Sequence, residues 1–117
     1  MNNQEIIRRK QYCQIVKEIT GSDQYLVIGI DVGKDKHHAF LGSATGKSLF
    51  RKLIFENDLD GFSRLQQIAD EIKSQNGLSK IVYGVEPTGN YHKLLARHLI
   101  RCACNVVLVS GVALKRN

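Results

Sequence analysis

Two short apolar runs in the chain each end in a carboxylate. Residues 25–31 form a β-branched run that closes on Asp31, and residues 80–86 form a second run that closes on Glu86. A continuous apolar run of this length is typical of a strand buried on both faces, because such a strand has no solvent side for polar residues. We therefore expect two buried strands, and a carboxylate at the end of a buried strand is costly unless a cation or basic group meets it.

Three more strands follow from weaker patterns. Residues 37–42 can be extended, and the composition of residues 43–46 is that of a turn. Residues 47–55 then form a strand, and residues 105–109 form the last one. The strand at 47–55 alternates only in part, since one face would carry Leu49, Arg51, Leu53 and Phe55.

Helical spacing appears in three segments. Residues 3–20 have a short apolar stripe, and we interpret residues 1–22 as a helical leader that precedes a domain at 23–117. The clearest helix follows Asn57, which can cap it, and its apolar positions are Leu59, Phe62, Leu65, Ile68, Ala69 and Ile72. A third helix follows the turn at 87–89 and places on one face Tyr91, Leu94, Leu95, His98 and Leu99.

The order of these elements predicts the fold class. Strands joined through a helix must pair in parallel along a right-handed path, whereas strands joined by tight turns form an antiparallel meander. A three-stranded meander followed by two strand–helix crossovers is the order of an α/β ribonuclease H-like mixed sheet. In that order the first and fourth strands are neighbours, so Asp31 and Glu86 would lie side by side at the edge where open α/β sheets bind ligands.

Two adjacent carboxylates repel each other unless a cation lies between them. Mg²⁺ (or Mn²⁺) accepts such oxygen ligands and keeps waters, which leaves room for substrate phosphates. Two ions of this kind can support phosphoryl transfer, but a complete two-metal site normally uses three or four carboxylates. Asp35 is a weak further candidate, and the chain has no Asp or Glu after Glu86.

Composition limits the class of protein. The chain of 117 residues is long enough for one domain, carries a formal charge of +6 and has three cysteines, an odd number. It has neither a secretion-type leader nor an apolar run of the roughly 20 residues that span a bilayer. We expect a cytoplasmic protein in a reducing setting, with semi-buried thiols at Cys102 and Cys104.

The basic residues gather in the last quarter of the chain. Because no acid follows Glu86, this segment has one sign of charge, which fits a surface that faces a phosphate backbone. A merely solvated basic face explains the charge equally well. Our candidate nucleic-acid contacts are Lys34, Lys93, Arg97, Arg101, Lys115 and Arg116.

The four histidines are expected to play ordinary roles. His37 and His38 alternate across a strand, so at most one faces the carboxylates, and each is interpreted as a surface or edge residue. His92 and His98 lie on or near the third helix, where partial burial and packing are the default.

The segments Ile28-Gly29-Ile30-Asp31-Val32-Gly33-Lys34, with a following His, and Val85-Glu86-Pro87-Thr88-Gly89-Asn90-Tyr91 carry a family likeness. They closely resemble the amino-terminal, RuvC-like domain of the DEDD transposases of the insertion-sequence-110 family. The resemblance implies that Asp31 and Glu86 match the first two of four acidic Mg²⁺ ligands.

The same resemblance implies a truncated piece of a longer enzyme that lacks two aspartates and the domain bearing the family's nucleophilic serine. Family members recombine DNA at insertion-sequence ends, and some use a structured guide RNA. DNA, and in some cases RNA, are thus the implied partners of a homo-oligomeric full-length protein, and this fragment alone would be inactive.

Two other functions fit parts of the pattern. Actin-like sugar or acetate kinases share the fold and often begin with a similar Gly-Ile-Asp-x-Gly strand, but they usually follow it with Thr or Ser where this chain has Lys34-Asp35. A non-catalytic nucleic-acid-binding module with a vestigial acidic pair is the other alternative.

Overall fold

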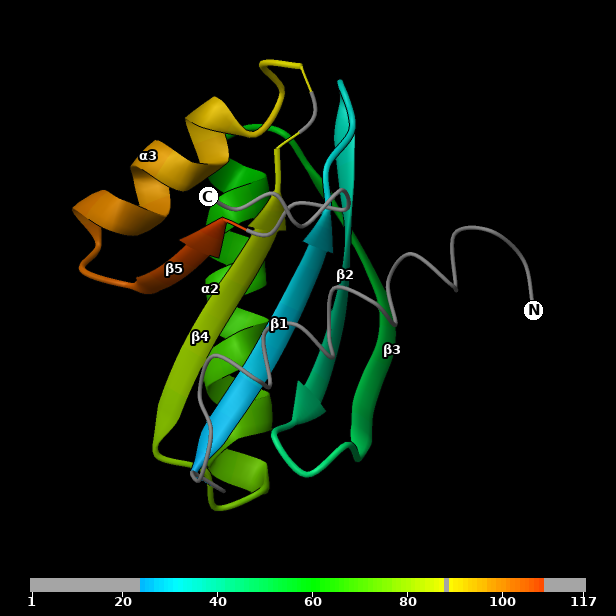
Figure 1. Cartoon of the computed structure of the whole chain (residues 1–117), viewed down its shortest axis with the longest axis vertical. Coiled ribbons are helices and arrows are strands. Elements are labelled where there is room, and N and C mark those ends of the chain that lie inside the picture. The colour runs from blue at the N-terminus through cyan, green and yellow to red at the C-terminus, as the bar shows by residue number, and fades with distance from the viewer. Residues whose placement is uncertain (1–23, 88, 109–117) are drawn as a thin grey trace, which may run out of the picture.

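The computed structural model describes residues 24–87 and 89–108 (Figure 1). The predicted order of strands and helices is confirmed over this range, and both buried strands have the expected bounds. The elements are β1 (Tyr25–Asp31), β2 (Lys36–Ser43), β3 (Ser48–Glu56), α2 (Leu59–Gln75), β4 (Lys80–Glu86), α3 (Lys93–Arg101) and β5 (Asn105–Leu108).

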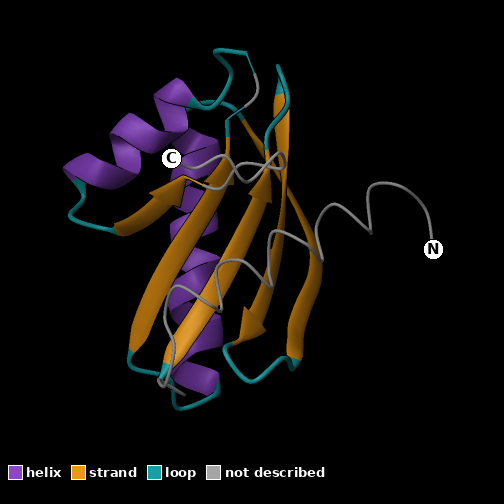
Figure 2. Cartoon of the chain, viewed as in Figure 1, coloured by secondary structure: helices purple, strands orange, loops and turns teal. Residues whose placement is uncertain are grey.

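The five strands form one mixed sheet in the order β3-β2-β1-β4-β5 (Figure 2). The pairs β1–β2 and β2–β3 are antiparallel, because tight turns connect them. The pairs β1–β4 and β4–β5 are parallel, because α2 and α3 connect β3 to β4 and β4 to β5. This α/β sheet is compatible with the ribonuclease H-like fold.

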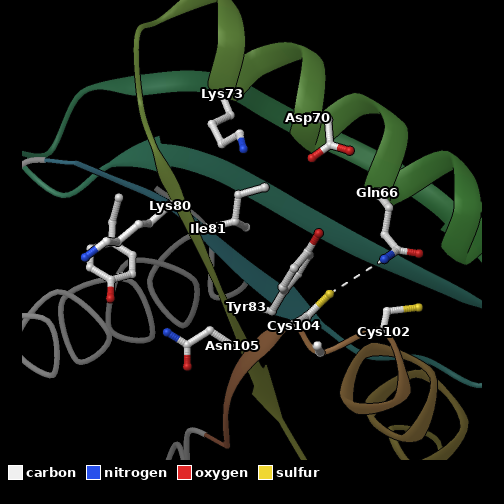
Figure 3. Close-up of a pocket in the computed structure, with 11 residues that line it drawn as sticks. Gln66, Asp70, Lys73, Lys80, Ile81, Tyr83, Cys102, Cys104 and Asn105 are labelled. Atoms are coloured by element: carbon white, nitrogen blue, oxygen red, sulfur yellow. Dashed lines mark hydrogen bonds between the residues drawn. The ribbon is translucent and has the colours of Figure 1, made fainter.

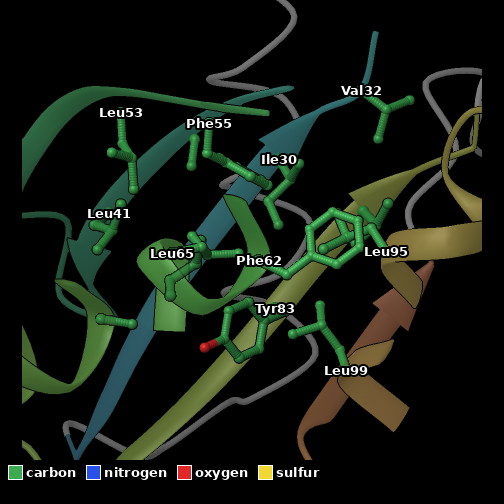
Figure 4. Close-up of a cluster of buried hydrophobic side chains, with 14 of the residues drawn as sticks. Ile30, Val32, Leu41, Leu53, Phe55, Phe62, Leu65, Tyr83, Leu95 and Leu99 are labelled. Carbon is green, nitrogen blue, oxygen red and sulfur yellow. The ribbon is translucent and has the colours of Figure 1, made fainter. Parts of the chain in front are cut away.

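Both helices contribute to a single core on one face of the sheet (Figure 4). Strand residues alternate between faces, so Leu26, Ile28 and Ile30 of β1 point to this side. Phe62 of α2 is fully buried, and it packs with Leu95 and Leu99 of α3 and with the strands. The opposite face of β1 and β4 carries a smaller cluster around Val27 and Val82.

The start of α2 differs from the prediction. Asp58, not Asn57, is the N-cap, and its carboxylate accepts a 2.8 Å hydrogen bond from the Gly61 amide. Asn57 is unavailable because its side chain bonds to β2 and to the loop before it. Gly61 lies so close to the end of β3 that a Cβ would overlap the Glu56 carbonyl, so the helix can pack here only without a side chain.

Two predicted apolar faces are only partly correct. In β3, Leu53 and Phe55 are buried as expected, but Arg51 is exposed, and the pairing with β2 is irregular around Leu41. In the third helix Leu95 and Leu99 are buried, whereas the remaining large side chains of the predicted stripe, Tyr91 and Leu94, are 42% and 46% exposed. Tyr91 lies before the helix begins, so its position does not follow the helical spacing.

The predicted leader at 1–22 and the segment after residue 108 lie outside the described residues. Neither of the two helices in the described part of the chain combines the length and the apolar character needed to cross a membrane.

Replacing Phe62 with Ala should lower the free energy of unfolding by about 3–5 kcal/mol, because the ring is fully buried in the core and leaves a cavity. Leu59→Ala is the matched control in the same helix: Leu59 is 63% exposed, so we expect a change within about 0.5 kcal/mol. Urea denaturation followed by circular dichroism measures both. Equal losses for the two variants would contradict the assigned core.

Candidate functional site

The two predicted carboxylates lie opposite each other on neighbouring strands. In the parallel pairing of β1 with β4 the partners run from Tyr25↔Lys80 to Asp31↔Glu86 without a register shift. Asp31 and Glu86 are therefore the last residues of two adjacent strands at the same edge of the sheet (Figure 1). Each is half-buried, so each carboxylate is partly removed from water without being enclosed.

Both carboxylates point to the face of the sheet away from α2. Side chains alternate along a strand, and Ile30 and Val85, the residues just before them, belong to the core under α2. His38 pairs with Asp31 from the other side, in β2, and therefore shares this face. The structure thus brings His38 to the carboxylate face and turns His37 to the core.

A pair of glycines precedes the two carboxylates on their strands. Gly29 pairs with Gly84 two residues before the acids, and both residues share the face of Asp31 and Glu86. At Gly29 an added Cβ would meet no described atom within 4 Å.

The donor set fits a hard divalent cation. Two carboxylates at equivalent positions of adjacent parallel strands repel each other, and a cation that accepts oxygen ligands relieves this repulsion. Within residues 24–87 and 89–108 no group of three or more His, Cys, Asp or Glu side chains gathers as a metal site. The described part of the chain therefore supplies a pair of carboxylate ligands and not a complete set.

His37 is not the surface or edge residue that the sequence suggested. It is fully buried, 5.2 Å from the Phe55 ring and 6.4 Å from the Phe62 ring between centroids. Its Nδ1 accepts a 3.1 Å hydrogen bond from the Gly33 amide, and its Nε2 lies 2.9 Å from Asn57 Oδ1. The available signal was its spacing, because His37 alternates in register with the apolar Ala39 and Leu41.

Burial lowers the pKa of His37 below its ordinary value of 6.5. The hydrogen bond to Asn57 and the charge of Asp31 oppose this shift, and the neighbouring His38 adds to it. The lowered pKa keeps the imidazole neutral at pH 7, which agrees with an Nδ1 that accepts a backbone hydrogen bond.

The candidate basic residues fall into two groups. Lys34 is exposed in the loop that follows Asp31, at the carboxylate edge. Lys93, Arg97 and Arg101 are exposed on α3 at spacings of four residues, so they form one stripe along the helix. The helix contains no acidic residue, and its first turn follows the loop that leaves β4 after Glu86. Lys115 and Arg116 lie outside the described residues.

The structure also contains a cavity of about 460 Å³ between α2, β4 and the start of β5 (Figure 3). It lies at the amino ends of β4 and β5, so it is remote from the carboxylate edge. Burial raises the pKa of both Tyr83 and Cys104, and the Cys104 thiol accepts from the Gln66 amide at 3.6 Å. Both groups are therefore protonated at pH 7, and neither is an activated nucleophile.

The expected partial burial of the other two histidines and of the thiols is largely correct, and His92 is half-buried just before α3. His98 is half-buried, with Nε2 2.8 Å from Gln66 Oε1 and its ring centroid 5.3 Å from that of Phe62. It therefore joins α3 to α2 as a packing residue. Cys104 is half-buried as expected, whereas Cys102 is exposed at the end of α3.

A comparison with models of protein families identifies a family for this chain. The family model described as Transposase, that of the DEDD transposases of the insertion-sequence-110 type, matches residues 28–117, which is most of the chain. No curated protein matches the chain.

Stability should fall as the pH drops below 6.5, because the unfolded chain then protonates His37 while the native state does not. The contribution is fully present above pH 6.5 and is lost toward the lowered native pKa. His37→Phe should flatten the dependence of the unfolding free energy on pH between about 7 and 5. His38→Gln, on the adjacent half-buried position, is the control: it removes a smaller cause of the shift than burial, so it should keep most of this dependence. An equally steep curve for His37→Phe would contradict a neutral buried imidazole.

Proposed function

Since the chain belongs to the DEDD transposases of the insertion-sequence-110 family, we propose that its carboxylate edge is part of a site that cuts and rejoins DNA at insertion-sequence ends. The observation that carries this proposal is the register of β1 and β4, which pairs Asp31 with Glu86 at the carboxyl edge. Open α/β sheets bind ligands at this edge.

Asp31 and Glu86 would hold Mg²⁺ or Mn²⁺ through carboxylate oxygens. When bound, such an ion stabilises negative charge on phosphate oxygens and lowers the pKa of a bound water. The chain itself fixes the two acids on neighbouring strands, and a pair of glycines precedes them on the same face. His38 shares this face and would lie beside an ion or phosphate held by Asp31.

Two carboxylates are fewer than a complete two-metal site uses. The chain contains no acid after Glu86, so we infer that this chain alone binds a divalent ion without cleaving DNA. The further acids implied by the resemblance to the family would have to join Asp31 and Glu86 before the site is competent.

The exposed stripe on α3 and Lys34 would contact the DNA backbone. Cations that neutralise phosphates release counterions, which gives binding with little sequence dependence. Lys34 lies three residues after Asp31 in the loop, and the α3 stripe begins after the loop that follows β4. A phosphate backbone that passes over this edge would therefore meet both the basic residues and the carboxylates.

Substituting either acid should weaken divalent ion binding. Asp31→Asn and Glu86→Gln each remove one of two charged ligands, so we expect the affinity for Mn²⁺ to fall by at least about tenfold. Water proton relaxation enhancement measures Mn²⁺ binding to the 117-residue chain. Asp70→Asn, in α2 and on the other side of the molecule, is the control and should bind as the parent does. Unchanged affinity in both site variants would refute the metal pair.

The same chain should bind Mn²⁺ but should not cut a labelled duplex in the presence of excess Mg²⁺, because it supplies only two carboxylate ligands. Robust cleavage by this chain that Asp31→Asn abolishes would contradict the incomplete site. A thermal shift with Mg-ATP that depends on Asp31 would instead favour the kinase alternative.

DNA affinity should depend on salt through the α3 stripe. Replacing Lys93, Arg97 or Arg101 with Gln should reduce the slope of log K against log salt by about 1 for each lost phosphate contact. Fluorescence anisotropy with a labelled duplex between 50 and 200 mM salt, roughly the range over which such slopes are resolved, gives the measurement. Lys52→Gln, an exposed position on β3, is the matched control.

A structured RNA of equal length in the same titration separates the two polyanions. If none of the three α3 substitutions changes the affinity or the salt dependence of DNA or RNA binding, the assignment of this stripe is wrong.

A further inference from the structure

His37 is a buried polar residue with a complete set of hydrogen bonds. It is 0% exposed, and burial of a polar ring in a core is unfavourable unless its nitrogens are bonded. Both nitrogens have partners: the Gly33 amide lies 3.1 Å from Nδ1, and Asn57 Oδ1 lies 2.9 Å from Nε2. A phenylalanine would fill the same aromatic space beside Phe55 and Phe62 without needing either bond.

These partners define the tautomer. A backbone amide can only donate, so Nδ1 accepts and carries no proton. The proton therefore sits on Nε2, which donates to Asn57 Oδ1. A second hydrogen bond supports this orientation of the Asn57 amide, because its Nδ2 donates to the Lys34 carbonyl at 3.1 Å.

Together with one backbone hydrogen bond, these three side-chain hydrogen bonds form a closed hydrogen-bonded ring around the loop that follows Asp31. His37 holds the Gly33 amide, and the Asn57 side chain holds the Lys34 carbonyl. The Asn57 amide adds a 2.9 Å bond to the carbonyl of Asp35. Three consecutive loop residues are thus fixed to β2 and to Asn57 in the connection between β3 and α2.

The backbone of this loop is also tightly constrained at Gly33. A Cβ at Gly33 would lie 2.5 Å from the Lys36 carbonyl, so the chain turns sharply there. Asp31 is the last residue of β1, and only Val32 separates it from Gly33. The backbone on the carboxyl side of Asp31 therefore depends on the bonds of His37 and Asn57.

We propose that His37 and Asn57 are positioning residues that fix the loop after Asp31, and with it the Asp31 carboxylate and Lys34, for binding of a divalent cation and a phosphate group. The proposal rests on the proposed function for what is positioned, whereas the hydrogen-bonded ring stands on the described contacts alone. Ligand geometry in such sites is commonly held by hydrogen bonds from residues behind them.

Three substitutions at position 37 separate the two bonds. In His37→Asn an amide oxygen can replace Nδ1 and accept from Gly33, but the side chain is too short to reach Asn57. In His37→Gln the amide reaches the place of Nε2 and leaves Gly33 without its acceptor. His37→Phe removes both bonds and retains the ring packing against Phe55.

Amide hydrogen exchange at Gly33 and Mn²⁺ affinity of the 117-residue chain are the two readouts. Exchange at Gly33 should speed up about tenfold in His37→Phe and His37→Gln and stay near the parent value in His37→Asn. Mn²⁺ affinity should fall about tenfold in His37→Phe. The imidazole ¹⁵N spectrum of the parent should show Nε2 protonated and Nδ1 bare.

Two further variants keep the test sound if His37→Phe does not fold. Asn57→Asp still accepts from Nε2 but cannot donate to the Lys34 carbonyl, whereas Asn57→Ala loses both contacts. The affinity for Mn²⁺ should therefore be highest for the parent, lower for Asn57→Asp and lowest for Asn57→Ala. Leu99→Ala, a fully buried residue of α3, destabilises the core without touching the loop and should leave Mn²⁺ affinity unchanged.

The outcomes distinguish this proposal from the proposed function. If the parent binds Mn²⁺ and both His37→Phe and Asn57→Ala bind equally well, the positioning role is overturned and the metal site stands. An Nδ1-protonated imidazole, or Gly33 exchange that ignores residue 37, also overturns it. If protection of the Gly33 amide depends on His37 but the parent binds no Mn²⁺, the hydrogen-bonded ring is confirmed and the proposed metal site is refuted.

Discussion

The parallel pairing of β1 with β4 is the constraint on which the rest of the structure depends. β1 is the central strand, so its register fixes β2 and β3 on one side and β4 and β5 on the other. The pairing is parallel because the chain must pass over the sheet through α2 to return in the same direction. One consequence is mechanical, since α2 covers the core face. The other is chemical, since two strands that end in acids must end together.

The two faces of the sheet separate stability from the candidate chemistry. The side under α2 holds the large core, in which the strand residues that alternate with the acids are fully buried. The side that bears Asp31 and Glu86 is lined nearby by paired glycines and His38. Repulsion between the acids therefore acts on a framework that is held from the other side. Such a framework can keep two like charges close while a cation is absent.

The sequence was sufficient for the elements and the register of the site. Both buried strands end in a carboxylate, and the strand–helix–strand order makes them parallel neighbours, so the pairing of Asp31 with Glu86 could be deduced. Side-chain hydrogen bonds could not. Asn57 and Asp58 are both suitable caps, and only the fold shows that Asn57 is occupied by His37 and the loop. His37 was misjudged because its polarity outweighed its alternation with Ala39 and Leu41, although that alternation placed it correctly.

His37 joins the two faces. Its ring lies in the core beside Phe55 and Phe62, yet its Nδ1 accepts a hydrogen bond from the loop that leaves the carboxylate edge. A neutral imidazole can do both, because one nitrogen accepts and the other donates while the carbon edge packs against aromatic rings. Protonation would place a second donor against the Gly33 amide and a charge inside the core. The burial that lowers the pKa of His37 therefore also preserves the hydrogen bond from the Gly33 amide to Nδ1. Packing of the core and geometry of the loop after Asp31 both depend on Nδ1 remaining unprotonated.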